Sequence, residues 1–288
     1  MLPPRIEQQN IKENEAAGWE KVFIERGWQI NHDNVHNLLD SGDTPYWRII
    51  QRCMPFVDAA LGDIRNKHGI DIASGFGWAA TRFAKQNARM TAADFNITEF
   101  NGLGAARHAL DEQTQFDLLQ CDAEELPIQN ESLDFAFICS ALHHFTEPAR
   151  AVQEVYRTLK PGGMFILICE AIRTGFCDAY RDKKNPDIHE FRNAGINEQS
   201  FKQSEYERMF LQAGFHLHTF FPAWDFPNGQ PFGAGWIHSD LRNALQDRSK
   251  IKQWIIRLLW RTPLLKLSRH IRMYYKATDR IFIAIKPN

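Results

Sequence analysis

A glycine-containing turn near residue 75 holds the first residues whose types and spacing could do chemistry. Residues 71–77 read DIASGFG and lead from an apolar run into a stretch of helical period. Glycine lets a backbone turn sharply and approach a ligand closely, and a helix that begins behind such a turn offers free N–H groups. The next apolar run ends at Asp94, where a carboxylate can accept hydrogen bonds from both hydroxyls of a ribose. The spacing therefore predicts a binding site for a nucleotide-like ligand.

This turn alone leaves several interpretations open. Gly75, Gly77 and Ala80 also fit the dinucleotide pattern G-x-G-x-x-G/A, with Asp94 close to the place of its acidic residue. A nicotinamide dehydrogenase is therefore one alternative, and a turn that binds no ligand is another.

Three further residues follow apolar runs and could take part in acid–base chemistry. His143 and His144 come directly after one run, and Glu170 ends a later one. Because histidine titrates near neutral pH, the pair is the best candidate for a general base, with Glu170 as a third catalytic candidate. The structural alternatives are that a histidine packs against the next helix and that Glu170 only forms an ion pair. Glu198 is expected either to face this site or to cap the helix that follows it.

Short apolar runs alternate with stretches in which apolar residues recur at helical spacing. The strands and helices that these patterns predict must position the candidate residues. The predicted strands cover residues 69–73, 90–93, 116–120, 133–140 and 164–169, with helices at 78–86, 99–110 and 147–159 between them. Such an alternation indicates βαβ units and a parallel sheet, whose strands share one carboxyl edge. Two later strands are predicted at 215–221 and 279–285, after a helix at 203–212, and residues 1–66 are predicted to be helical.

Later segments of the chain match one family in the order of its motifs. These segments are DAEELPI from Asp122, SLDF at 132–135, LKPGG at 159–163, EY at 205–206 and AGF at 213–215. Together with DIASGFG they make residues 65–220 resemble the class I S-adenosylmethionine (SAM)-dependent methyltransferases of the type 11-like group. A nicotinamide dehydrogenase has no reason to carry DAEELP and LKPGG at these places.

The resemblance implies an α/β, Rossmann-like fold with a seven-stranded, mostly parallel sheet and helices on both faces. It divides the chain into a helical N-terminal cap (1–66), a SAM-binding core (67–221), a basic amphipathic insertion that could form a lid (222–278) and the final strand (279–288). The cap is expected to cover the cofactor, with Tyr46, Trp47 and Arg48 near the methionine end of SAM.

The function implied by the resemblance is transfer of a methyl group from SAM to a small-molecule or lipid-linked acceptor. Asp94 would hold the ribose, Asp122 the adenine, and the turn at 73–77 the amino-acid end of the cofactor. The full set expected to contact SAM is Asp71, Ala73, Ser74, Gly75, Gly77, Asp94, Phe95, Asp122, Ala123 and Ser140.

The catalytic residues expected under this function are His143, His144 and Glu170, and no metal is predicted. Ala73 stands where the family has its first glycine. If the backbone at residue 73 needs a positive φ, alanine lowers the stability of that conformation by about 1 kcal/mol relative to glycine. A SAM-binding protein without turnover is therefore the alternative.

A basic segment near the C-terminus suggests a second kind of contact. Residues 239–276 contain ten Lys or Arg and two Asp, whereas the whole chain has a net charge of −1. Apolar residues recur at helical spacing through 251–259, so that 248–276 has the character of a basic amphipathic helix. One interpretation is peripheral contact with a membrane or a lipid-linked acceptor. A second is an apolar face packed on the domain, with a solvated basic face. A third, which the net charge of the chain disfavours, is contact with nucleic acid.

The composition of the chain argues against several other classes of protein. The net charge of −1 argues against a general nucleic-acid binder. Five scattered cysteines without a C-x-x-C pair predict neither a disulfide framework nor a zinc site, and they suit a reducing compartment. No apolar run approaches 18 residues, so a cytoplasmic protein is expected, with membrane association through 248–276 as an addition.

Overall fold

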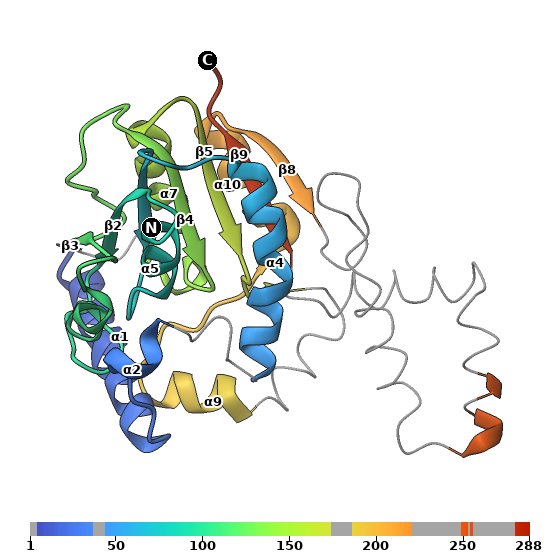
Figure 1. The fold of residues 1–288 in the computed structure, drawn as a ribbon. Helices are drawn as coiled ribbons and strands as arrows, with labels where there is room; N and C mark the ends of the chain where they lie inside the picture. Colours follow the sequence, from blue (N-terminus) through green and yellow to red (C-terminus); the bar gives the residue numbers. More distant parts are fainter. Residues whose placement is uncertain (1–4, 37–43, 174–185, 221–248, 253, 256–279) are drawn as a thin grey trace.

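The structure of this chain is a computed structural model that describes residues 5–36, 44–173, 186–220, 249–252, 254–255 and 280–288 (Figure 1). Most of the predicted insertion at 222–278 lies outside the described residues, and with it the interpretation of that segment as a lid. Among the described residues, no helix has the length and apolar content needed to cross a membrane.

Seven strands form one sheet in the order β3-β2-β1-β4-β5-β9-β8. Their bounds are β1 His68–Ile72, β2 Arg89–Asp94, β3 Phe116–Gln120, β4 Leu133–Cys139, β5 Leu159–Ile168, β8 His216–Phe220 and β9 Ile281–Ile285. β9 runs antiparallel to both of its neighbours, and its first residue, Ile281, pairs with Phe220 at the end of β8. The predicted seven-stranded, mostly parallel sheet is therefore confirmed. A separate two-residue pairing of β6 (Ile172–Arg173) with β7 (Phe201–Lys202) was not predicted.

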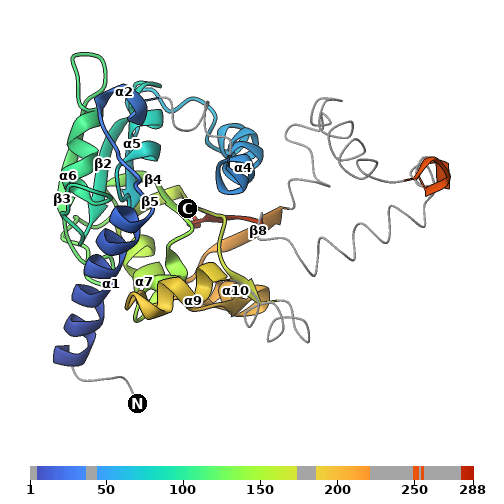
Figure 2. The ribbon, with the colours of Figure 1, turned by 90° about the horizontal axis from the view of Figure 1, so that it is seen from below.

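Helices cover both faces of the sheet, as predicted. Their bounds are α1 Arg5–Glu25, α2 His32–Val35, α4 Pro45–Leu61, α5 Trp78–Ala84, α6 Leu103–Ala106, α7 Pro148–Thr158, α9 Pro186–Asn193 and α10 Gln203–Ala213, with short 3-10 turns η1 Arg107–Ala109 and η2 Leu142–His144. α4 and α5 lie on one face, and α7 and α10 on the other (Figure 2). The helix expected over 99–110 is shorter, because Gly102 takes an extended conformation and α6 begins only after it.

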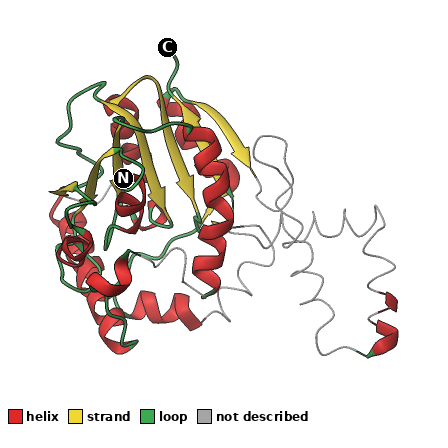
Figure 3. Ribbon diagram, in the orientation of Figure 1, coloured by secondary structure: helices red, strands yellow, loops and turns green. Residues whose placement is uncertain are grey.

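The core follows from alternation along the central strands. Phe135 and Phe137 of β4 pack with α4 and α5, whereas Ala136 and Ile138 pack with α7 and α10. Burial on both faces is typical of the inner strands of a parallel sheet. The parallel strands point towards the end of the sheet where α1 and α9 lie (Figures 1 and 3). The carboxyl ends of β1, β2, β4 and β5 therefore meet at that end.

Candidate active site

A cavity of about 970 Å³ opens at these carboxyl ends. Eight of the residues expected to contact the cofactor line it: Ala73, Ser74, Gly75, Asp94, Phe95, Asp122, Ala123 and Ser140. His143 and His144 line the same cavity. The structure therefore brings the predicted cofactor residues and the histidine pair to one space.

The glycine turn and Asp94 are joined directly. The N–H of Gly75, whose φ is +53°, donates to Oδ2 of Asp94 at 2.8 Å, and the N–H of Asn96 donates to Oδ1 at 2.8 Å. Burial raises the pKa of Asp94 to about 6, although these two hydrogen bonds act to lower it. At neutral pH the carboxylate is thus ionised, and it can accept hydrogen bonds from a ribose.

Asp71 and Gly77 are not among the residues that line the cavity. Asp71 is 3% exposed and accepts a hydrogen bond from the N–H of Ala80, in the first turn of α5, at 3.0 Å. Asp71 therefore ties β1 to the helix behind the turn, so we assign it a positioning role. Burial raises its pKa to about 8.

This buried carboxyl predicts a pH-dependent stability. An aspartate in an unfolded chain titrates near pH 3.9, so the folded chain binds more protons between pH ~4 and the pKa of about 8. The free energy of unfolding therefore falls as pH rises through this window. Asp71→Asn keeps an acceptor for Ala80 and removes the charge. We expect the variant to be more stable than the parent protein at pH 9 by ~1–3 kcal/mol, with the difference shrinking towards pH 4, in urea titrations.

The matched control is Asp117→Asn, on the exposed side of β3. Its unfolding curve should follow that of the parent protein at every pH. A constant difference between parent and Asp71→Asn from pH 5 to pH 9 would contradict the prediction.

Three residues at neighbouring strand ends adopt positive φ without being glycine. They are Ala73 after β1 (φ 52°), Ser140 after β4 (φ 53°) and Cys169 after β5 (φ 61°). Such conformations are costly for residues with a Cβ, and they gather at functional sites. The position of Ala73 thus does require the conformation that glycine adopts at little cost.

Ala73→Gly is therefore expected to stabilise the protein slightly. Glycine removes the steric cost of the left-handed conformation, which raises the free energy of unfolding by ~1–2 kcal/mol. Glycine also gives the unfolded chain more conformational freedom, which lowers the free energy of unfolding by ~0.4–1 kcal/mol. Urea unfolding should show a net gain of about 0.5 kcal/mol. Ala80→Gly in the regular helix α5 is the control, and it should lose ~1 kcal/mol or more. Equal losses for both variants would show that position 73 is not strained.

Asp122, the predicted adenine contact, is shared with the N-terminal helix. Lys12 of α1 forms an ion pair with Asp122 and another with Glu124, at 2.8 Å. Burial disfavours the charge on Lys12, but the hydrogen bonds to these two carboxylates outweigh it and raise its pKa. α1 therefore lies across the end of the cavity at Asp122, and any ligand group that binds this carboxylate has to share it with Lys12.

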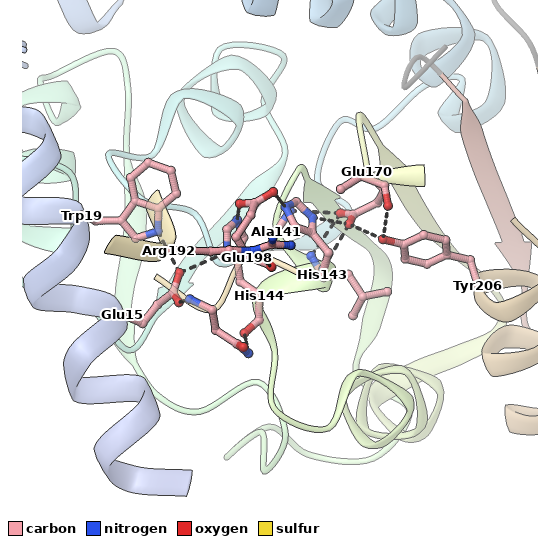
Figure 4. A network of polar contacts seen from close by, with 12 residues as sticks. Glu15, Trp19, Ala141, His143, His144, Glu170, Arg192, Glu198 and Tyr206 are labelled. Atoms are coloured by element: carbon pink, nitrogen blue, oxygen red, sulfur yellow. Dashed lines mark hydrogen bonds and ion pairs between the residues drawn. The ribbon is translucent and has the colours of Figure 1, made fainter. Parts of the chain in front are cut away.

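His143 is held by Glu170 in a buried network (Figure 4). Nδ1 of His143 lies 2.7 Å from Oε2 of Glu170, which is fully buried and also accepts the hydroxyl of Tyr206 at 3.1 Å. The N–H groups of residues 141–143 donate to the same carboxylate. Burial acts to raise the pKa of Glu170, but His143 and these donors lower it. Glu170 thus fixes both the ring of His143 and the backbone that carries it.

His144 lies beside two carboxylates that come from distant parts of the chain. Its Nδ1 is 3.1 Å from Oε1 of Glu15 in α1, and its Nε2 is 3.8 Å from Glu198. Glu198 also lies 3.7 Å from Nε2 of His143, so it faces this site and does not cap α10. Trp19 donates to Glu15 at 2.9 Å and holds that carboxylate in place.

Aromatic side chains form much of the remaining wall of the cavity. They are Trp19, Phe23, Trp28, Tyr46, Trp47, Phe76, Trp78, Phe145 and Phe191. Tyr46 and Trp47 are thus at the cavity, as expected, whereas Arg48 is exposed and is not among its lining residues. Sequence reasoning did not identify Lys12, Glu15 or Trp19, although their spacing of three and four residues places them on one face of α1.

Comparison with known proteins gives matches to methyltransferases. Residues 70–167 match the family described as a methyltransferase domain. This part of the chain is thus similar to a methyltransferase domain. A demethylmenaquinone methyltransferase of Clavibacter sepedonicus is 31% identical over 139 residues, 48% of this chain and 53% of that protein. The chain thus spans about half the length of the curated relatives it matches.

Solved structures share the fold of this chain. Haemonchus contortus phosphoethanolamine N-methyltransferase 2, in complex with phosphomonomethylethanolamine and S-adenosylhomocysteine, is 16% identical, with a TM-score of 0.51 over 88% of this chain and 61% of its own. The [4+2]-cyclase SpnF is 18% identical, with a TM-score of 0.51 over 86% and 85%. Identities this low show the fold alone, and a fold does not fix a reaction.

Proposed function

We propose that this chain is a SAM-dependent methyltransferase that acts on a small-molecule acceptor. The observation that carries the proposal is the hydrogen bond from Gly75 to the carboxylate of Asp94, because it joins the glycine turn and a ribose acceptor at one cavity. The methyltransferase domain at residues 70–167 supports the same function.

The residues of the cavity fit SAM. Asp94 would hold the ribose, Asp122 the adenine amino group, and the turn at 73–76 the amino-acid end. A Cβ on Gly75 would lie 3.0 Å from the carbonyl oxygen of Asn101, so close packing as well as the positive φ favours glycine at this position of the turn. A volume of about 970 Å³ is at the upper end of the ~300–1,000 Å³ usual for ligand sites, which leaves room for an acceptor beside the cofactor.

When bound, SAM supplies a methyl group on a positively charged sulfur, which is already electrophilic. The protein itself has to place the acceptor, exclude water and manage one proton. We assign the proton to Nε2 of His143, because Nδ1 is already committed to Glu170. Glu170 is then a positioning residue, and the aromatic wall limits how much water reaches the site. His144 lies alongside, with its ring centre 4.1 Å from that of His143.

The lining of the cavity favours a flat, largely apolar acceptor with one ionisable group. Aromatic rings such as Trp19, Tyr46 and Trp47 offer broad apolar surfaces, and the histidine pair offers one polar point. The match to a demethylmenaquinone methyltransferase supports an acceptor of the quinone type.

Transfer of labelled methyl groups tests the proposal. Calorimetry with SAM and with NAD should give binding of SAM alone. Incubation of the protein with labelled SAM and a lipid-containing cell extract should then label one compound, which mass spectrometry identifies. Tight SAM binding with no labelled product would instead support a SAM-binding protein without turnover.

We also propose peripheral membrane contact through the basic segment. In the part that the structure describes, Ile251 is 74% exposed and Trp254 is 64% exposed, next to Lys250 and Lys252. Exposed apolar and cationic side chains together favour anionic lipid surfaces. The full chain should float with phosphatidylserine vesicles, whereas a variant that lacks residues 248–276 should stay in the dense fraction. Equal flotation of both proteins would show that this segment does not make the membrane contact.

A further inference from the structure

A compact group of three metal-ligating side chains lies at the centre of the network in Figure 4. His143, His144 and Glu198 each offer one ligand atom, and these atoms lie within 4.8 Å of one another. Glu198 is nearly equidistant from the two rings, at 3.7 Å from Nε2 of His143 and 3.8 Å from Nε2 of His144. The two imidazoles therefore present the same type of nitrogen to one carboxylate.

The opposite nitrogen of each ring faces a second carboxylate. Nδ1 of His143 contacts Glu170 at 2.7 Å, and Nδ1 of His144 lies 3.1 Å from Glu15. Histidines that bind metals usually have a carboxylate or carbonyl at the other nitrogen, which fixes the tautomer and makes the ligating nitrogen more basic. His143 has this arrangement as a hydrogen bond to Glu170. At His144 the carboxylate of Glu15 lies at contact distance from Nδ1, but this nitrogen makes no hydrogen bond within the described residues.

The charges of the group also favour a cation. Glu15 is 4% exposed, Glu170 is fully buried, and the side chain of Glu198 is 11% exposed. Among the described residues, the ion pairs of these three carboxylates are with the two histidines. Buried carboxylates need paired charges or metal ions to offset the loss of water. A divalent cation between the rings and Glu198 would supply that charge.

We propose that His143, His144 and Glu198 bind a divalent transition-metal ion with an open coordination position towards the cavity. Two imidazoles and one carboxylate suit Zn²⁺ or Fe²⁺, whereas Mg²⁺ prefers oxygen ligands alone. Zinc bonds of ~2.0–2.2 Å in a tetrahedral site put neighbouring ligands about 3.3 Å apart. The 3.7 and 3.8 Å distances run to different oxygens of Glu198, Oε1 and Oε2. One ligand atom from each of the three residues lies within 4.8 Å of the others, so the group would close by up to about 1.5 Å around the ion.

A metal here would change how the acceptor is handled, and this consequence alone rests on the proposed function. Nε2 of His143 would be a ligand and no longer a proton acceptor. An acceptor oxygen bound at the open position would have its O–H acidified by the metal and release its proton to water. The acceptor would then carry a hydroxyl or enol oxygen at the methylated position or beside it.

Metal binding is tested directly on the full chain after treatment with a chelator. Calorimetry should show one Zn²⁺ per chain and no heat with Mg²⁺, and Co²⁺ should develop the visible absorption of a low-symmetry site. His144→Ala and Glu198→Gln should each weaken Zn²⁺ binding by more than the ~10–100-fold that loss of an outer partner costs. His108→Ala and Glu112→Gln, both exposed, are the matched controls and should bind as the parent protein does.

The result separates this inference from the proposed function. SAM calorimetry on the same samples reports whether each variant is folded and whether the cofactor site works. SAM binding without Zn²⁺ binding, or Zn²⁺ binding that both ligand variants retain, would overturn the metal site and leave the methyltransferase proposal standing. Zn²⁺ binding without SAM binding would do the reverse.

Discussion

Replacement of His143 by alanine is expected to slow methyl transfer by a factor of roughly 100 to 10,000, the usual contribution of a positioned acid–base group. Affinity for SAM should be unchanged, because His143 lies at the ends of β4 and β5 and its contacts are to Glu170 and Glu198. The measurement is single-turnover transfer from labelled SAM to the compound identified in extract, together with SAM calorimetry. A slower transfer rate with unchanged SAM affinity is the result that identifies a role in proton handling.

The control for His143→Ala is His108→Ala, an exposed histidine in η1. Because His143 is 4% exposed, its loss also lowers stability, so transfer is compared well below the melting temperature of both variants. An unchanged rate in His143→Ala would refute the assignment of proton handling or metal binding to this residue. A loss of SAM affinity equal to the loss of rate would instead indicate collapse of the whole site.

Asp94→Ala should weaken SAM binding by roughly 100-fold or more. Hydrogen bonds to a charged acceptor contribute ~1.5–3 kcal/mol each, and the carboxylate has two ribose hydroxyls to accept. The variant also loses the bond that holds Gly75 in place. Calorimetry with SAM measures the effect, and Asp117→Ala on the exposed side of β3 is the matched control.

The pH dependence of SAM affinity gives a second test of the role of Asp94. Burial raises the pKa of Asp94 to about 6, and a protonated carboxyl is a weaker acceptor for two hydroxyl donors. SAM affinity of the parent protein should therefore fall as pH is lowered through 6. Asp94→Asn should bind weakly at every pH. A parent protein whose affinity is level between pH 5 and pH 8 would contradict the role of Asp94.

The sheet and the cofactor side of the site follow from local patterns. Each predicted strand overlaps an observed one, because buried parallel strands are short apolar runs separated by polar, helical stretches. The turn near Gly75 and Asp94 are close in sequence and sit at adjacent strand ends, so topology alone brings them together.

The acceptor side depends on contacts that sequence patterns do not encode. Glu15 meets His144 across more than a hundred residues, and α1 has almost no apolar periodicity to show which face turns inwards. α9 lies in a polar stretch without a clear period, and it brings Phe191 to the cavity. Both α1 and α9 thus reach the cavity through tertiary packing.

The pairing of Phe220 with Ile281 has a consequence for the architecture of the chain. The long segment between them leaves and re-enters the sheet at adjacent points, as the two ends of a hairpin do. A short engineered turn could therefore bridge the gap without altering the register of either strand. The pairing of β8 with β9 therefore sets no limit on the length of the segment that connects them.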